Sequence, residues 1–243
     1  MVSRSQLKYI QSLGQKKHRD TEGVFVAEGP KLVKELIESK NAELTQVYTL
    51  NEWAEENKDL LKDISVTAIN ETELERITQL TTPNKVLAVV KKFETNEPVI
   101  NERISLVLDA IRDPGNLGTI IRIADWFGIS QIICSGDCAD MYNSKVVQAT
   151  MGSIARVNVF YTDLPVWLKQ SPGVRIYAAM LEGKDATKMS TIKEGLIIIG
   201  NESMGIDKEV VPYANEKISI PRKGRAESLN AAVATGIILS HLV

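Results

Sequence analysis

Three segments of the sequence place polar side chains that could do chemistry next to an apolar run. The segments are LDAIRDPGNLGTIIRIADWFG (108–128), LIIIGNESMG (196–205) and ISIPRKGRAESLN (218–230). Their candidate side chains are amides, a hydroxyl, a carboxylate and a guanidinium, on Asn116, Arg122, Glu202, Ser228 and Asn230. Groups of these kinds orient a polar substrate, stabilise developing charge and handle a proton. Because ligands in open α/β sheets bind outside the carboxyl ends of strands, we expect the three segments to converge.

Taken one at a time, these residues have ordinary structural interpretations. Asn116, predicted in a turn, and Ser228 could each cap a helix, Glu202 could be a solvated loop acid, and the glycines of the segments could serve only as flexible backbone. A strand-to-helix connection does not, however, need Arg122 one helical turn further on. It is the order and spacing of the three segments that predict a site.

Several kinds of catalysis lack their residues. The two histidines, His18 and His241, lie beside no plausible nucleophile, which argues against Ser–His and Cys–His catalysis and against zinc hydrolysis. The two cysteines, Cys134 and Cys138, are expected to be core or sub-surface thiols. None of the fifteen glycines forms a G-x-G pair, and no P-loop is present, which argues against nicotinamide, flavin and nucleoside triphosphate cofactors. The sequence predicts no metal.

Charge is distributed unevenly along the chain. The net charge of −2 argues against nucleic-acid binding by bulk charge alone. Residues 1–19 nevertheless carry five cations and no acid, and PRKGR (221–225) carries three cations in five residues. Each could be a solvated surface or a contact for a polyanion. No apolar run approaches the roughly 18 residues of a membrane span, and the N-terminus lacks an apolar signal region, so we expect a cytoplasmic protein with no membrane partner.

Apolar periodicity predicts two α/β domains, 1–95 and 96–243, joined near residues 94–102. In the first, helices are predicted at 5–13, 29–39 and 70–77, and strands at 24–29, 46–50, 64–69 and 86–93. In the second, strands are predicted at 104–109, 131–136, 156–161, 175–180, 195–200 and 217–220, and helices near 117–128, 143–150, 163–170, 207–213 and 229–241. Continuous apolar strands such as LIIIG predict a buried parallel sheet covered by helices.

In order and spacing, the three segments resemble the three motifs of the SpoU (TrmH-type) RNA ribose 2′-O-methyltransferases of the SPOUT superfamily. The likeness covers roughly residues 104–243, where TMGSIARVNV (150–159) resembles a further family segment. More loosely, VFVAEGPKLVKELI (24–37) is similar to the small ribosomal-protein-like substrate-binding domain that precedes many members.

The resemblance implies a trefoil-knotted α/β methyltransferase domain, a homodimer whose active site is completed across the interface, S-adenosylmethionine as cofactor and RNA as substrate. It implies cofactor contacts at Ala179, Leu181, Gly200, Asn201, Ile220 and Leu229. It implies catalytic or substrate-positioning roles for Asn116, Arg122, Glu202, Ser228 and Asn230. Arg222 and Lys223 depart from the apolar or small residues usual after the Ile-Pro pair, and they favour phosphate contact.

Arg122 is the residue whose role the family leaves most open. A guanidinium is protonated at any ordinary pH, so a role as general base needs a large perturbation of its pKa. We expect instead that Arg122 grips the phosphate beside the target ribose and stabilises charge on the 2′ oxygen, while Asn116 and Glu202 order it and the ribose.

The predicted function is methyl transfer from S-adenosylmethionine to a ribose 2′-hydroxyl of structured RNA. The additional N-terminal domain favours 23S ribosomal RNA over tRNA. The alternative is a non-catalytic RNA-binding or ribosome-assembly protein that retains the fold. The joint presence of the five polar site residues favours the enzyme.

Overall fold

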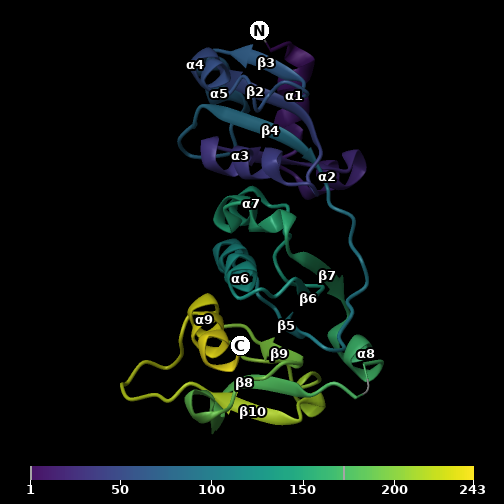
Figure 1. The fold of residues 1–243 in the computed structure, drawn as a ribbon, viewed down its shortest axis with the longest axis vertical. Coiled ribbons are helices and arrows are strands. Elements are labelled where there is room, and N and C mark those ends of the chain that lie inside the picture. The colour runs from purple at the N-terminus through teal and green to yellow at the C-terminus, as the bar shows by residue number, and fades with distance from the viewer. Residues whose placement is uncertain (1, 172) are drawn as a thin grey trace. The chain divides into compact units, whose positions relative to one another are not determined.

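The structure, a computed structural model, describes residues 2–171 and 173–243 (Figure 1). The described chain divides into two compact units. The N-terminal unit holds the chain up to Glu94 together with Asp140–Ala155, and the C-terminal unit holds Thr95–Ala139 and Arg156–Val243. The segment Asp140–Ala155 therefore belongs by its packing to the N-terminal unit, although the chain on both sides of it belongs to the C-terminal unit.

The N-terminal unit is built on a mixed four-stranded sheet of order β1-β4-β2-β3. Strand β4 is antiparallel to both β1 and β2, and β2 is parallel to β3. The strands are β1 (Val24–Glu28), β2 (Leu44–Leu50), β3 (Val66–Ile69) and β4 (Val86–Lys91). The helices are α1 (Arg4–Ser12), α2 (Lys16–Glu22), α3 (Pro30–Glu38), α4 (Asn51–Glu56), α5 (Glu71–Ile77) and α7 (Ser144–Thr150).

Asp140–Ala155 is joined to the rest of the N-terminal unit by both polar and aromatic contacts. The buried guanidinium of Arg19 donates to the carboxylate of Asp140 at 2.6 Å and to two carbonyl groups at the end of α1. The ring of Tyr142 lies 5.0 Å from that of Phe25, and its hydroxyl accepts the backbone N–H of Phe93. A buried charge is tolerated only when it is paired in this way, so Arg19 fixes the segment strongly.

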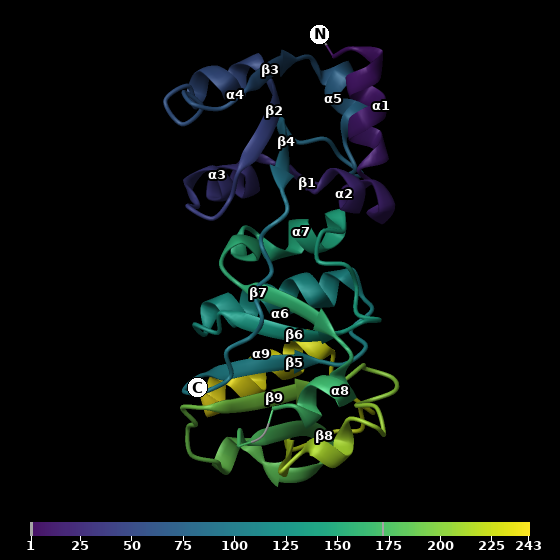
Figure 2. The same cartoon turned by 90° about the vertical axis from the view of Figure 1, so that its right-hand side faces the viewer.

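The C-terminal unit contains a six-stranded, all-parallel sheet of order β10-β8-β9-β5-β6-β7 (Figure 2). Its strands are β5 (Ile104–Leu108), β6 (Gln131–Ser135), β7 (Asn158–Thr162), β8 (Ile176–Asp185), β9 (Gly195–Ile199) and β10 (Glu216–Ser219). Its helices are α6 (Pro114–Trp126), α8 (Leu164–Lys169) and α9 (Ala231–Leu242), with 3-10 turns η1 (Ser153–Ala155, in the N-terminal unit), η2 (Ala186–Lys188) and η3 (Val211–Tyr213).

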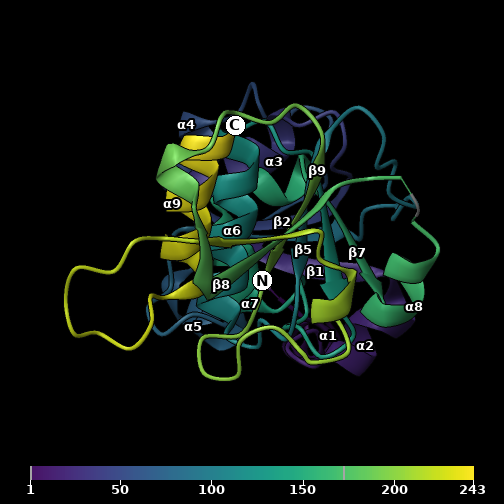
Figure 3. The ribbon, with the colours of Figure 1, turned by 90° about the horizontal axis from the view of Figure 1, so that it is seen from below.

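Both faces of this parallel sheet are covered, which explains its continuous apolar strands. Alternate strand residues such as Val107 and Ile198 pack with Leu164 and Leu168 of α8. Helices α6 and α9 pack against each other on the other face (Figure 3). The central strand β9 is buried along its whole length.

The predicted fold class is confirmed: a small α/β unit precedes an α/β unit with a parallel sheet. Some element boundaries differ. Helix α6 begins at Pro114, so Asn116 lies in its first turn and Asp113 is the cap. Asn230 rather than Ser228 caps α9. The helix predicted at 207–213 shrinks to the turn η3 because Pro212 interrupts it, and α2 and α4 were not predicted.

Candidate active site

The loop after β5 is held rigidly where it enters α6. Ala110 has a left-handed backbone (φ 54°), which is uncommon outside glycine. Its N–H donates to the Ser135 hydroxyl at 2.8 Å, and its carbonyl accepts from the Asn201 side chain at 2.9 Å. Asp113 then accepts the N–H of Asn116 at 2.8 Å and caps the helix. These bonds fix the backbone from which the Asn116 side chain projects.

The chain after β9 forms a tight hairpin over residues 200–206. Asn201 and Gly205 exchange backbone hydrogen bonds of 3.0 and 2.8 Å. A Cβ atom at Gly200 would overlap the backbone of Gly205, so only glycine fits this position. The Asn201 side chain accepts the N–H groups of Ser203 and Met204. The hairpin thereby presents Glu202 at a fixed place.

The polar residues of the three segments meet at one point. The Asn116 amide nitrogen donates to a carboxylate oxygen of Glu202, and the Asn230 amide nitrogen donates to the Asn116 carbonyl oxygen at 2.8 Å. Asn230 is itself fixed, because its side-chain oxygen accepts the N–H groups of Ala232 and Val233. A carboxylate and two amides, 114 residues apart at their extremes, therefore form one hydrogen-bonded chain.

Beside this chain lies a cleft of about 740 Å³, here called the main cleft. Glu202 and Ser228 line it. So do all six predicted cofactor residues, which are Ala179, Leu181, Gly200, Asn201, Ile220 and Leu229. Its volume falls in the range of small-molecule sites, and its walls mix apolar side chains with loop backbone, as such sites do. The residues present therefore suit a cofactor of the size of S-adenosylmethionine.

Arg122 does not join this cluster within one chain. It lies six residues after Asn116 on α6, which turns it about 240° around the helix axis. Its side chain is exposed and makes no hydrogen bond or ion pair with the residues that the structure describes. The structure thus gathers Asn116, Glu202 and Asn230, places Ser228 on the cleft wall and leaves Arg122 facing solvent.

Sequence reasoning missed Asp109 as a residue that holds the site together. Asp109 is only 5% exposed and accepts the backbone N–H of Asp207 at 2.6 Å, which ties the loop after β5 to the chain after β9. Burial raises the pKa of this carboxyl, and the negative charges of Asp207 and Asp137 add to the effect. An acid at the end of a buried strand, as in ISLVLD, was the available signal.

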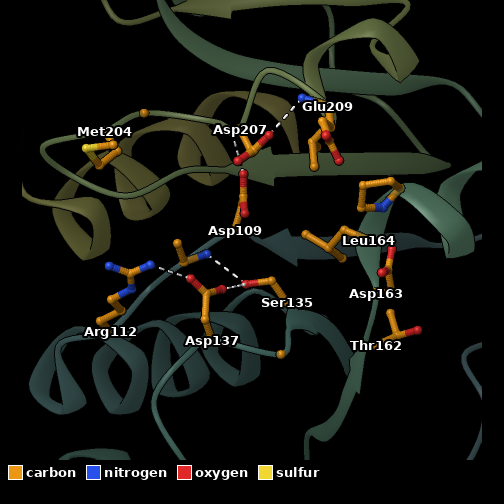
Figure 4. Close-up of a pocket in the computed structure, with 15 residues that line it drawn as sticks. Asp109, Arg112, Ser135, Asp137, Thr162, Asp163, Leu164, Met204, Asp207 and Glu209 are labelled. Carbon is orange, nitrogen blue, oxygen red and sulfur yellow. Dashed lines mark hydrogen bonds and ion pairs between the residues drawn. The ribbon is translucent and has the colours of Figure 1, made fainter.

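A second hollow, here called the acidic crevice, lies at the carboxyl ends of β5, β6 and β7 (Figure 4). Its volume is about 370 Å³. Five carboxylates line it, together with Arg112: Asp109, Asp137, Asp163, Asp207 and Glu209. Arg112 pairs with Asp137 at 2.6 Å. The hydrogen bond from the Ser135 hydroxyl, and then that from Arg112, hold the pKa of the Asp137 carboxyl below its usual range. Met204 and Gly205 line both hollows, so the 200–206 hairpin is the wall between them.

Comparison with known proteins decides the family. The profile of the SpoU rRNA Methylase family matches residues 103–240, which include all three segments. The chain belongs to the SpoU rRNA methylase family. It is therefore a methyltransferase, and the resemblance seen in the sequence is confirmed. The profile of the MRM3-like substrate binding domain matches residues 4–88.

Individual SpoU relatives match over nearly the whole chain. The 23S rRNA (guanosine(2553)-2′-O)-methyltransferase RlmP of Bacillus subtilis is 30% identical over 93% of this chain and 91% of its own length. The 23S rRNA (uridine(2479)-2′-O)-methyltransferase of Streptomyces viridochromogenes is 28% identical over 95% of this chain and 86% of its own. The rRNA methyltransferase of Sinorhizobium meliloti, solved with AdoMet bound, is 32% identical and superposes with a TM-score of 0.86, covering 99% of this chain and 95% of its own. The trefoil knot expected from the resemblance is implied by this shared SpoU fold.

No helix within residues 2–171 or 173–243 combines the length and the apolar character needed to cross a membrane.

Proposed function

We propose that this SpoU protein transfers a methyl group from S-adenosylmethionine to a ribose 2′-hydroxyl of 23S ribosomal RNA. One observation carries the proposal: Glu202, Asn116 and Asn230, from three separate strand-end loops, form a single hydrogen-bonded chain beside the main cleft. The matched relatives named as 23S rRNA 2′-O-methyltransferases, and the AdoMet-bound relative, support the same reaction. An RNA substrate also agrees with the cytoplasmic location that the sequence predicts.

S-adenosylmethionine supplies an already electrophilic methyl group, so the chain has to align two reactants and manage one proton. In the proposal, Gly200, Ile220 and Leu229 hold the cofactor largely through backbone, and Ala179, Leu181 and Asn201 complete its site. Asn116 is oriented at both ends, because its nitrogen donates to Glu202 while its oxygen accepts from Asn230. This pre-set amide, with the Glu202 carboxylate and the Ser228 hydroxyl, positions the ribose.

In the proposal, Arg122 acts on the ribose phosphate from a second copy of the chain. Its exposure on α6 leaves the guanidinium free for a partner. One turn further on the same face, Trp126 is 85% exposed, and on the packed helix α9 Val233 is 51% exposed. Exposed apolar surface of this kind marks an interaction site, which supports a homodimer through α6 and α9. A permanently charged Arg122 then clamps phosphate and stabilises charge on the 2′ oxygen rather than accepting a proton.

In the same proposal, the N-terminal domain (1–95) binds the RNA substrate and residues 96–243 form the catalytic domain. The match of residues 4–88 to a substrate-binding domain supports this division of labour. The matched relatives that act on 23S rRNA favour ribosomal RNA over tRNA.

The direct test incubates the purified chain with radiolabelled S-adenosylmethionine and unmodified transcripts of 23S rRNA or tRNA, followed by mapping of 2′-O-methyl positions. We expect one ribose of the 23S transcript to be methylated and the tRNA to remain unmodified. Calorimetry with the cofactor alone gives a separate readout. If the chain does not bind the cofactor and transfers no labelled methyl group to RNA, it is an RNA-binding protein without this activity.

The role of Arg122 across a dimer is tested by mixing two inactive variants. We expect Arg122→Ala and Asn116→Ala each to reduce single-turnover methylation by about 100-fold or more, the usual cost of removing a group that stabilises transition-state charge. If Arg122 acts on the partner's site, re-mixing the two variants restores about a quarter of wild-type activity. Random pairing makes about half of the dimers mixed, and each mixed dimer has one intact site of its two. Arg122→Lys keeps the charge without the bidentate fork and should fall between. Methylation within a few-fold of wild type in Arg122→Ala would contradict both the clamp and the base.

A further inference from the structure

The loop between β10 and α9 leaves every one of residues 221–230 exposed. It contains no helix or strand, and Figure 3 shows it standing out from the body of the C-terminal unit. Surface loops on a rigid scaffold carry binding residues disproportionately often. This loop also carries part of the third sequence segment, which makes its side chains candidates for binding a ligand.

The first part of this loop, residues 221–227, is here called the basic loop because it carries Arg222, Lys223 and Arg225 against a single acid, Glu227. Among the residues that the structure describes, none of these three cations forms an ion pair. The Arg222 guanidinium donates a hydrogen bond to the carbonyl of Ala226 at 3.3 Å, within the loop itself. Three cations thus remain available to a polyanion.

The basic loop is also a wall of the main cleft. Arg222, Lys223 and Gly224 line the cleft together with Ile220 and Leu229, which are proposed cofactor contacts. Five residues after Arg225 the same loop reaches Asn230, which bonds to Asn116. An extended chain of that length spans at most about 17 Å. Arg225 is therefore tethered near the proposed position of the target ribose, while Arg222 and Lys223 lie on the wall of the cleft itself.

Charge elsewhere on the unit points a polyanion in the same direction. The acidic crevice, on the other side of the 200–206 hairpin, presents five carboxylates and repels phosphate. The basic loop, which forms one wall of the main cleft, attracts phosphate. The two hollows together direct an RNA strand toward the cleft that holds the polar chain.

Resting on the proposed function, we propose that Arg222, Lys223 and Arg225 form a clamp for the RNA phosphates that flank the methylated nucleotide. Each cation neutralises one phosphate and releases condensed counterions on binding. The clamp supplies affinity and register without reading base identity, because phosphate contacts position a strand and carry no sequence information. Specificity for one nucleotide comes from other parts of the chain.

The test compares two triple variants with the same loss of charge. One is Arg222→Gln/Lys223→Gln/Arg225→Gln, and the matched control is Lys169→Gln/Lys193→Gln/Lys208→Gln, which removes three exposed lysines outside the loop. The Kd for a mixed-sequence 30-nucleotide single-stranded RNA and for an unmodified 23S transcript is measured between 50 and 300 mM KCl. Each lost phosphate contact lowers the slope of log Kd against log salt by about 0.7 on a single strand.

We expect the loop variant to lose about 2 from this slope and to bind RNA at least tenfold more weakly at low salt, while the control changes both far less. In the control variant, cofactor binding by calorimetry and the rate at saturating RNA should stay within about threefold of wild type. The charge-retaining variant Arg222→Lys/Arg225→Lys should keep the wild-type slope.

Equal losses in both triple variants would overturn the clamp, because bulk charge would then explain them. A wild-type slope in the loop variant, or a loss of slope in the charge-retaining variant, would also overturn it. Failure of the proposed reaction gives a different result. The wild-type protein would then bind RNA through the loop, but it would not bind the cofactor and would not transfer a labelled methyl group to the RNA.

Discussion

The main cleft and the acidic crevice lie at the same edge of one parallel sheet, yet they differ in every property that matters for a ligand. The acidic crevice is lined in part by the loops after the adjacent strands β5 and β9. The chain after β5 continues to β6 on one side of the sheet, and the chain after β9 continues to β10 on the other side. Open α/β sheets usually bind ligands at such a switch point. The acidic crevice is the smaller hollow and is lined by carboxylates. The main cleft lies on the far side of the 200–206 hairpin and is lined by all six proposed cofactor residues together with Glu202 and Ser228.

This difference shows that topology alone does not locate a site. The rule for open sheets points to the acidic crevice, whereas the chemistry of the lining points to the main cleft. In the crevice, Asp109 and Asp207 are used structurally, to hold two loops together. In the main cleft, by contrast, Glu202 is bonded to Asn116 and also lines the cavity. The 200–206 hairpin separates these two uses, so substitutions on its two sides should have different consequences.

The largest effect is expected from glycine substitutions that compare the two hollows. Gly200→Ala introduces a Cβ into the backbone of Gly205, so the 200–206 hairpin has to shift, and overpacking of this kind costs about 3 kcal/mol. Because the hairpin lines the proposed cofactor site, we expect this cost to appear as a loss of about 150-fold in cofactor affinity. Calorimetric titration with S-adenosylmethionine measures it.

Two matched glycines serve as controls for that substitution. Gly136→Ala in the crevice and Gly224→Ala in the basic loop meet no atom within 4 Å, so both should bind the cofactor as wild type does. Equal loss in Gly136→Ala would show that the crevice takes part in cofactor binding.

A smaller effect is expected from Glu202. Glu202→Ala removes the carboxylate that orients Asn116, and a misplaced reacting group costs on the order of 100-fold in rate. Single-turnover methylation should fall by that amount while cofactor affinity changes little. Asp137→Asn, in the crevice, should leave the rate within about threefold. Comparable losses in the two variants would remove the functional distinction between the hollows.

The smallest effect is a pair of opposite pH dependences within the crevice. The pKa of Asp109 is raised by burial, so its ionised form disfavours the folded state and stability is lost as pH rises through that pKa. Asp109→Asn removes this loss and keeps an oxygen to accept the Asp207 N–H. The free energy of unfolding of Asp109→Asn relative to wild type should therefore increase from pH 3.5 to 7.

Asp137 should show the reverse. The Ser135 hydroxyl and Arg112 lower its pKa, so its ionised form stabilises the folded chain above its ordinary pKa, and that contribution disappears as pH falls. The free energy of unfolding of Asp137→Asn relative to wild type should decrease from pH 3.5 to 7, by little because the pair is exposed. Denaturant melts across this range measure both variants, and slopes of the same sign would refute the assigned causes.

Much of the fold and of the site follows from local sequence. Apolar strands such as LIIIG predicted a buried sheet, and the motif order predicted that Asn116, Glu202 and Asn230 would meet. These succeed because strand ends in a parallel sheet share one edge. The sequence did not show which way the Arg122 side chain points relative to Asn116. That direction depends on where α6 begins, and α6 begins at Pro114 rather than near the predicted residue 117.

Long-range packing accounts for the rest. No local pattern reveals that Arg19 pairs with Asp140, or that Tyr142 stacks near Phe25, since these partners are more than 100 residues apart. The acidic crevice is equally non-local, because its carboxylates follow four different strands and each resembles a solvated loop acid when considered alone.

The membership of Asp140–Ala155 in the N-terminal unit has a practical consequence for dissecting this enzyme. The polypeptide passes between the units three times, after Glu94, Ala139 and Ala155. A truncation that begins at residue 96 would strip Tyr142 of its aromatic neighbours and Asp140 of its guanidinium. Exchange of the N-terminal unit between relatives therefore requires two grafts, the leading segment and the sixteen-residue insert, carried over as a matched set.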